Sequence, residues 1–71
     1  MGVQTFTAVI YKEQDLYVAN CPEAGTVSQG YTIEEAIANL KEATELYLAE
    51  FPLPEMARPL LTTFEAAVAY A

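Results

Sequence analysis

Histidine is absent from this 71-residue sequence, and the single cysteine, Cys21, therefore has no imidazole partner to activate it as a nucleophile. Histidine is the commonest general base and the commonest zinc ligand, so the main routes to acid–base and zinc chemistry are missing. Cys21 precedes Pro22 at the end of an expected strand and is interpreted as a small, partly buried apolar residue. Gly2, Gly25 and Gly30 lack the spacing and the following lysine of a phosphate-binding loop. We therefore assign no catalytic, cofactor-binding or metal-ligating residue and expect that the protein is not an enzyme.

Carboxylates are the remaining groups that could support catalysis, because several of them together can hold divalent metal ions for phosphoryl transfer. Such a site needs acidic side chains that converge from the centre of a sheet and from the facing side of a helix. Glu13 and Asp15 instead fall in an expected hairpin, where turn formation explains them. Glu34, Glu42 and Glu45 lie off the apolar stripe of the expected helix and are interpreted as solvated. A metal-dependent enzyme is therefore the last of three hypotheses for function.

The net charge of −7 narrows the class of partner. Ten acidic residues face only Lys12, Lys41 and Arg58. This balance repels a phosphate backbone and offers few counterion-releasing contacts, so we expect no direct binding to nucleic acid. The same field would accelerate encounter with a basic protein, although acidic surfaces also serve solubility alone.

Targeting signals are not evident in the sequence. No apolar run approaches the roughly 20 residues of a membrane span, and the first residues, MGVQTFTAV, lack the basic flank and apolar stretch of a signal peptide. A small secreted domain would normally need several disulfide bonds, which one cysteine cannot form. We therefore expect a cytoplasmic protein with no membrane partner.

Three short segments have the composition of β-strands. In the first segment, both sets of alternate residues are about half apolar. The polar Glu13-Gln14-Asp15 then suits a hairpin that leads into an antiparallel second strand. Pro22 and Gly25 interrupt the second strand, and Gly30 turns the chain after the third. The predicted strands span about residues 3–12, 15–20 and 26–29.

A helix is predicted over residues 33–50. Thr32 and Glu35 have the spacing of a capping box, and apolar residues then recur at helical spacing as one broad stripe that should dock on the sheet. Pro52 disfavours helical geometry at the preceding residue and so ends the helix.

The C-terminal part of the sequence allows two structures. Prolines keep residues 52–59 extended as a connector, and residues 60–69 alternate in the manner of a fourth strand. Thr62 and Glu65 could equally form a capping box that opens an alanine-rich helix.

These elements predict one α+β domain over residues 1–71, with the order β-β-β-α-β and a small, mainly antiparallel sheet. A single helix can cover only one face of that sheet. Because the first strand is apolar on both sides, we expect the other face or an edge to meet a second copy or a different protein. A homodimer or higher homo-oligomer follows from this expectation.

A strand, a proline–glycine turn, a second turn and a capped helix follow one another with distinctive residues. These residues are Tyr17-Val18-Ala19-Asn20-Cys21-Pro22-Glu23, Gly25, Ser28-Gln29-Gly30, Thr32, Glu34-Glu35-Ala36 and Asn39-Leu40-Lys41-Glu42-Ala43. In them, the sequence resembles the HicB antitoxin family over residues 5–50. The resemblance implies a degenerate ribonuclease-H-like sheet of order β-β-β-α-β that has lost its catalytic carboxylates.

The resemblance also implies a function and a partner. HicB antitoxins bind a small basic HicA toxin, an RNA-cleaving protein with a catalytic histidine, and block its active surface. Many of them carry a further C-terminal DNA-binding segment. The present sequence resembles a short, single-domain form without that segment, so operator binding is expected to be absent.

A HicB-like antitoxin is therefore the leading hypothesis. The alternative is an orphan HicB-like homo-oligomer with a structural or regulatory role and no toxin partner. The residues expected to contact a partner are Glu23 in the turn and Glu34, Glu42 and Glu45 on the outer helix face. Edge-to-edge pairing through the sheet or the fourth strand is the alternative mode of contact.

Overall fold

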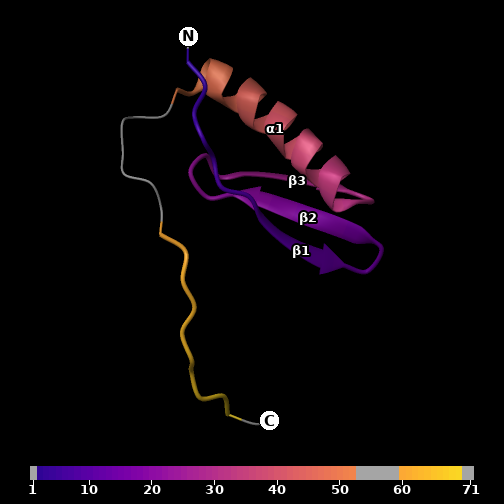
Figure 1. Cartoon of the computed structure of the whole chain (residues 1–71), viewed down its shortest axis with the longest axis vertical. Helices are drawn as coiled ribbons and strands as arrows, with labels where there is room; N and C mark the ends of the chain where they lie inside the picture. The colour runs from indigo at the N-terminus through magenta and orange to yellow at the C-terminus, as the bar shows by residue number, and fades with distance from the viewer. Residues whose placement is uncertain (1, 53–59, 70–71) are drawn as a thin grey trace.

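Three antiparallel strands form a meander, with neighbouring strands in chain order, and one helix packs across one face of this sheet (Figure 1). The structure, a computed structural model, describes residues 2–52 and 60–69. The α+β class and the β-β-β-α order predicted from the sequence are confirmed. The elements are β1 (Val9–Glu13), β2 (Leu16–Cys21), β3 (Thr26–Gly30) and α1 (Ile33–Glu50).

Strand register determines which side chains meet the helix. Ala19 in β2 pairs with Ile10 on one side and with Ser28 on the other, so these three residues share one face of the sheet. That face carries a core of small side chains, which lets the helix lie close to the strands. The buried apolar residues are Ala19, Cys21, Ala36 and Leu40, and the partly buried Phe6, Ile10, Tyr17 and Ala24 pack around them.

Gly30, the last residue of β3, permits the closest contact between sheet and helix. A Cβ at this position would lie 2.6 Å from the backbone nitrogen of Ala36 and 2.9 Å from the Cβ of Glu35. Backbone atoms cannot accept such a contact without moving. The sequence predicted only that Gly30 turns the chain, whereas the structure shows that it is required for close packing.

The ends of α1 follow from local hydrogen bonds. The hydroxyl of Thr32 accepts a hydrogen bond from the backbone N–H of Glu35 at 3.0 Å, as predicted. The carboxylate of Glu35 reaches back one residue further than in the usual capping box and accepts from the N–H of Tyr31 at 2.6 Å. At the other end, the N–H of Phe51 donates to the carbonyl of Tyr47. The predicted bounds of 33–50 are confirmed.

The first strand is shorter than predicted. β1 begins at Val9, opposite Asn20, because β2 ends one residue later at Cys21 and the chain then turns. In the part of the chain that the structure describes, residues 2–8 therefore have no neighbouring strand to which they could hydrogen-bond. β2 and β3 lie within one residue of their predicted bounds.

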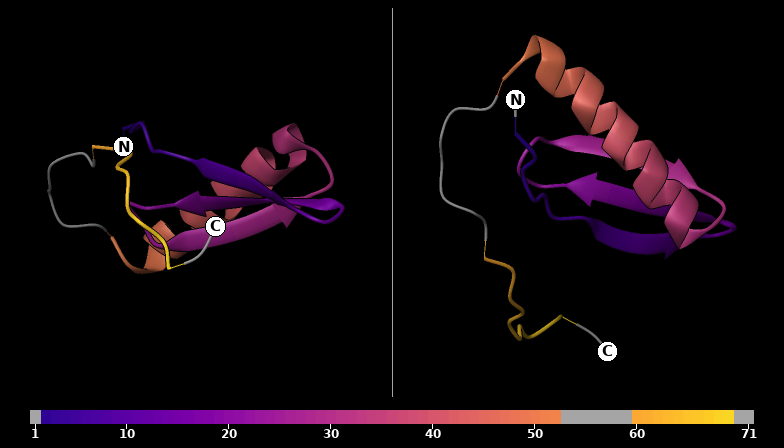
Figure 2. Two further views of the ribbon diagram at one scale, coloured as in Figure 1. Left: turned by 90° about the horizontal axis from the view of Figure 1, so that it is seen from below. Right: turned by 45° about the horizontal axis from the view of Figure 1, so that its top comes forward.

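The predicted fourth strand, residues 60–69, is not formed within the single chain, and neither is the alternative helix. Every residue of this segment is exposed, and Figures 1 and 2 show it apart from the sheet. The Cα radius of gyration is 14.6 Å, against about 11 Å for a compact chain of this length. An alternating pattern does not make a strand unless a neighbour pairs with it, and ten residues are too few for a stable isolated helix.

Two further expectations concern the chain between and around these elements. The predicted connector falls mostly on residues 53–59, which lie outside the described residues. Among residues 2–52 and 60–69, no helix has the length and apolarity needed to cross a membrane.

Replacing Gly30 by alanine should destabilise the fold by about 1–3 kcal/mol, because the added methyl group overlaps backbone atoms of α1. Urea unfolding followed by circular dichroism measures this change. The matched control is Gly2→Ala, where an added Cβ meets nothing within 4 Å. Equal stability of the Gly30→Ala and Gly2→Ala proteins would contradict the packing role of Gly30.

Candidate protein-binding surface

Only a narrow stripe of α1 is buried against the sheet. Ala36, Leu40 and Thr44 recur at every fourth position, and the Thr44 hydroxyl is satisfied by a 2.7 Å hydrogen bond with the hydroxyl of Thr26 in β3. Ile37, an apolar residue next to this stripe, is 43% exposed. The sheet therefore covers only part of the apolar surface of the helix.

A groove of about 720 Å³ runs between the N-terminal residues and the uncovered side of α1. It exists because the helix packs mainly on β3 and less on β2, which leaves the space on the β1 side open. Residues 2–8 run past the end of the sheet toward the C-terminal end of α1 and form the other wall (Figure 1). The apolar side chains that line the groove include Val3, Phe6, Ile37, Leu40 and Leu48.

The sheet face opposite the helix is also uncovered. The register pairs Tyr11 with Val18 on this face. Val27 of β3, which pairs with Asn20, lies on the same face. Val27 is 60% exposed. The Tyr11 hydroxyl accepts a 2.8 Å hydrogen bond from the side-chain amide of Asn20. This face provides a second apolar surface, as the sequence predicted from the two-sided first strand.

Glu23 attaches residues 2–8 to the turn between β2 and β3. Its two carboxylate oxygens accept from the backbone N–H of Thr7 at 3.0 and 3.1 Å, and one of them accepts from the Thr7 hydroxyl at 2.8 Å. The Cys21 thiol lies 3.5 Å from the other oxygen. Glu23 was predicted as a partner contact, and the structure places its carboxylate on its own chain. Local sequence patterns do not predict this bond, because Thr7 and Glu23 are 16 residues apart along the chain.

The pKa of Glu23 reflects these contacts. Partial burial of the carboxyl group favours its neutral form and so raises its pKa, whereas the hydrogen bonds lower it. The hydrogen bonds from Thr7, from the backbone of Glu23 and from Cys21 together outweigh burial, so the pKa of Glu23 is lowered from its ordinary value. The carboxylate that holds the wall of the groove is therefore ionised at neutral pH.

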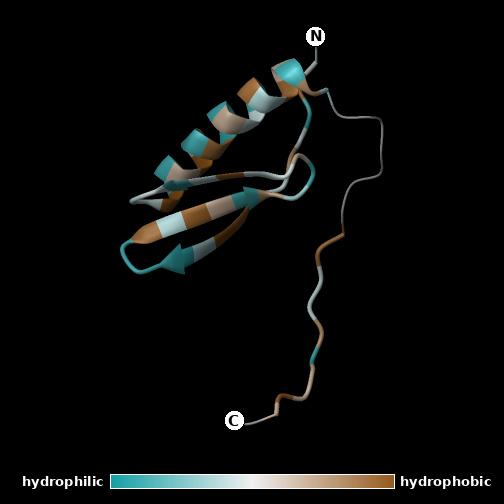
Figure 3. Ribbon diagram, turned by 180° about the vertical axis from the view of Figure 1, so that it is seen from behind, coloured by the Kyte–Doolittle hydropathy of each residue, from teal (hydrophilic) through white to brown (hydrophobic). Residues whose placement is uncertain are grey.

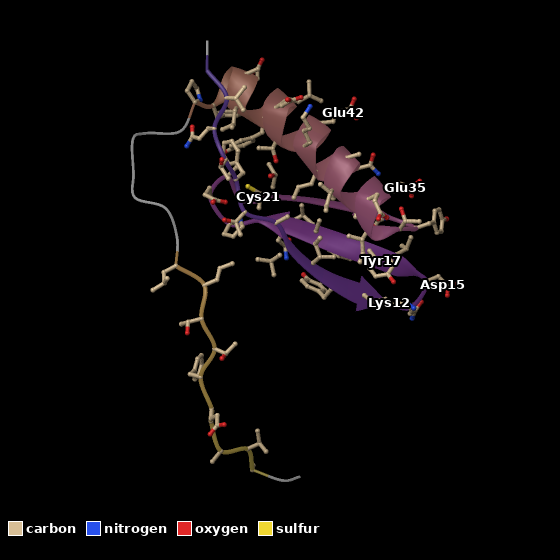
Figure 4. The ribbon with its side chains drawn as sticks, viewed as in Figure 1. Lys12, Asp15, Tyr17, Cys21, Glu35 and Glu42 are labelled. Atoms are coloured by element: carbon tan, nitrogen blue, oxygen red, sulfur yellow. The ribbon has the colours of Figure 1, made fainter. Side chains whose placement is uncertain are left out.

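The other three predicted contact residues lie exposed on α1. Glu34 is in the first turn, where it also complements the helix dipole, and Glu42 projects from the outer side of the helix (Figure 4). Glu45 forms an exposed 3.4 Å ion pair with Lys41 at the rim of the groove. Exposed pairs of this kind stabilise a fold very little, so these acids remain available to a partner.

The residues considered for metal chemistry do not converge. Asp15 lies at the hairpin between β1 and β2, away from Glu35 and Glu42 on α1 (Figure 4). Within the described ranges, no three Cys, Asp or Glu side chains are grouped so as to hold a metal ion. Cys21 is 1% exposed at the base of the groove, where it forms part of the core.

One curated protein is similar to the chain over most of both lengths. It is a UPF0150 protein of Helicobacter pylori strain J99, 49% identical over 51 residues that cover 70% of this chain and 71% of the relative. The chain belongs to the UPF0150 family. No family model matches this UPF0150 chain, and no solved structure matches it. The name UPF0150 states no activity, so the surfaces described above carry the functional argument.

Glu23→Gln should lower the free energy of unfolding at pH 7 by about 1–2 kcal/mol, because hydrogen bonds to an ionised group contribute more than those to a neutral one. The folded pKa of Glu23 is lowered, so its stabilisation is complete above the ordinary glutamate pKa and is lost as the pH falls through the folded value. Urea unfolding between pH 3 and 7 should thus show a flatter acid limb for Glu23→Gln. The exposed Glu42→Gln is the control, and an unchanged acid limb in Glu23→Gln would contradict the assignment.

Proposed function

We propose that this UPF0150 chain is a HicB-like antitoxin, a protein-binding module that neutralises a HicA-type RNA-cleaving toxin by direct contact. The distinctive residues that resemble HicB lie in β2, β3 and α1 and in the turns between them, and β2 and α1 supply the four buried apolar residues of the core. The homology to a UPF0150 protein is consistent with a small family of this type. The distribution of charge over the surface adds a physical argument.

The observation that carries the proposal is the acidic outer side of α1. Glu34, Glu42 and Glu45 are all exposed, and Lys41 is the one basic residue on this helix. The acids are distributed over three turns of a rigid element rather than clustered in a loop. Such a surface complements a basic protein whose own active surface binds RNA.

Charge complementarity predicts how the contact would work. Acidic side chains on the outer side of α1 would raise the association rate with a basic toxin more than they would raise the affinity. Occupation of the toxin's basic surface by these carboxylates would exclude the RNA phosphates from it. The antitoxin needs no catalytic group for this role.

An affinity pull-down of the tagged full-length chain from a lysate of its own source cells, with mass spectrometry of the retained proteins, tests the partner. The proposal expects a small, basic, histidine-containing protein whose cleavage of RNA stops when purified UPF0150 chain is added. Recovery of untagged copies of the chain alone would overturn it in favour of the orphan homo-oligomer.

The double variant Glu34→Gln/Glu42→Gln should bind that toxin with an association rate about tenfold lower at low ionic strength, because two steering charges are removed. Stopped-flow or surface plasmon resonance measurements at low and high salt give the rate, and the difference should shrink as salt screens it. Glu13→Gln/Asp15→Asn changes the net charge equally but lies in the hairpin, so it should have a much smaller effect. Equal effects of the two double variants would contradict a contact surface on α1.

A further inference from the structure

The β1 edge of the sheet is open to another strand. In the order β1-β2-β3, β1 has one neighbour, and residues 2–8, which continue it toward the N-terminus, have none within residues 2–52 and 60–69. The opposite edge is less open, because the Asn39 side chain of α1 donates a 2.8 Å hydrogen bond to the carbonyl of Gln29 in β3. Unpaired backbone groups along an edge form a template for an added strand.

Segment 60–69 has the properties of the missing strand. Its alternate residues Leu60, Thr62, Phe64, Ala66 and Val68 form one mainly apolar face, and Figure 3 shows mostly hydrophobic colours along the segment. Leu60 is 89% exposed, Phe64 88% and Val68 74%. Three large apolar side chains exposed to this degree on one face of a ten-residue segment are unfavourable to leave in water.

The groove beside the β1 edge can receive that apolar face. Its lining combines Phe6 from the N-terminal wall with Ile37 and Leu48 from α1. A strand paired with the edge formed by residues 3–12 would direct alternate side chains to the helix side of the sheet, where this groove lies. Both segments have ten residues, about 33 Å when extended, so their lengths match.

Within the single chain, segment 60–69 does not cover the groove, and its own apolar face stays exposed. Segment 60–69 does not fold back onto its own sheet, and among the described residues the buried apolar core contains four, a small core for independent stability. We infer that segment 60–69 of one chain adds as a fourth strand to the β1 edge of a second copy, and that the two copies exchange these strands reciprocally. The exchange places Phe64 of each copy in the groove of the other and completes the β-β-β-α-β order across two chains.

This exchange is independent of toxin binding, because it uses the β1 edge and the groove rather than the acidic outer side of α1. Light scattering and sedimentation of the 71-residue chain should give a molecular mass of twice 7.8 kDa. Phe64→Asp should raise the dimer dissociation constant by at least about 100-fold, since it brings a charge into an apolar groove. Thr63→Asp adds the same charge on the opposite face of the strand and should leave the constant within about threefold of the original.

Nuclear magnetic resonance on the unaltered protein distinguishes exchange from every other arrangement. A sample mixed from ¹³C-labelled and unlabelled chains should show isotope-filtered contacts between the Phe64 ring of one chain and the methyl groups of Ile37 or Leu48 of the other. The same contacts found only within one chain would overturn the inference, as would a monomer or a dimer without them. Because this measurement needs no variant, a folding defect in Phe64→Asp would not affect it.

Discussion

The contact between Gly30 and the first turn of α1 determines the distance between the helix and the sheet. With no side chain on Gly30, the backbone of Ala36 approaches β3 so closely that only small residues fit between helix and sheet. The core is therefore built from Ala19, Cys21 and Ala36, with Leu40 as its largest buried side chain. A close helix–sheet contact of this kind excludes water with little apolar surface, but it also limits how much surface one chain can bury.

The position of the helix explains the surfaces that remain open. Because α1 is drawn toward β3 at its N-terminal end, it does not cover the β1 side of the sheet. The groove, the unpaired edge formed by residues 2–8 and the uncovered opposite face all follow from one helix serving three strands. Thr7 donates hydrogen bonds to the Glu23 carboxylate, and these hold the N-terminal residues in place as one wall of the groove. The open surfaces of the described domain are thus a direct result of its small core.

Charge and apolar surface are separated on the molecule. The carboxylates of Glu34 and Glu42 face outward from α1, whereas the apolar groove opens beside the buried stripe of the same helix. This separation lets two kinds of partner contact different sides of one domain. A basic protein suits the acidic side, and an apolar strand suits the groove and the free edge.

Much of the local structure could be predicted from the sequence, because it depends on neighbours within a few residues. Thr32 and Glu35 define the start of α1 and Pro52 defines its end, and the polar hairpin residues separate β1 from β2. The outward position of Glu34, Glu42 and Glu45 followed from helical periodicity alone. The relative shows that the chain belongs to the UPF0150 family, and the HicB resemblance remains a prediction from the sequence.

What the tertiary structure alone decided involves contacts between residues distant in the sequence. The spacing function of Gly30, the capture of Glu23 by Thr7 and the groove beside α1 all depend on where the helix settles on the sheet. The structure of segment 60–69 also depends on residues distant in the sequence. Its alternating pattern was read correctly as apolar on one face, but a strand exists only where a neighbour supplies hydrogen bonds, and none of residues 2–52 forms a strand beside it.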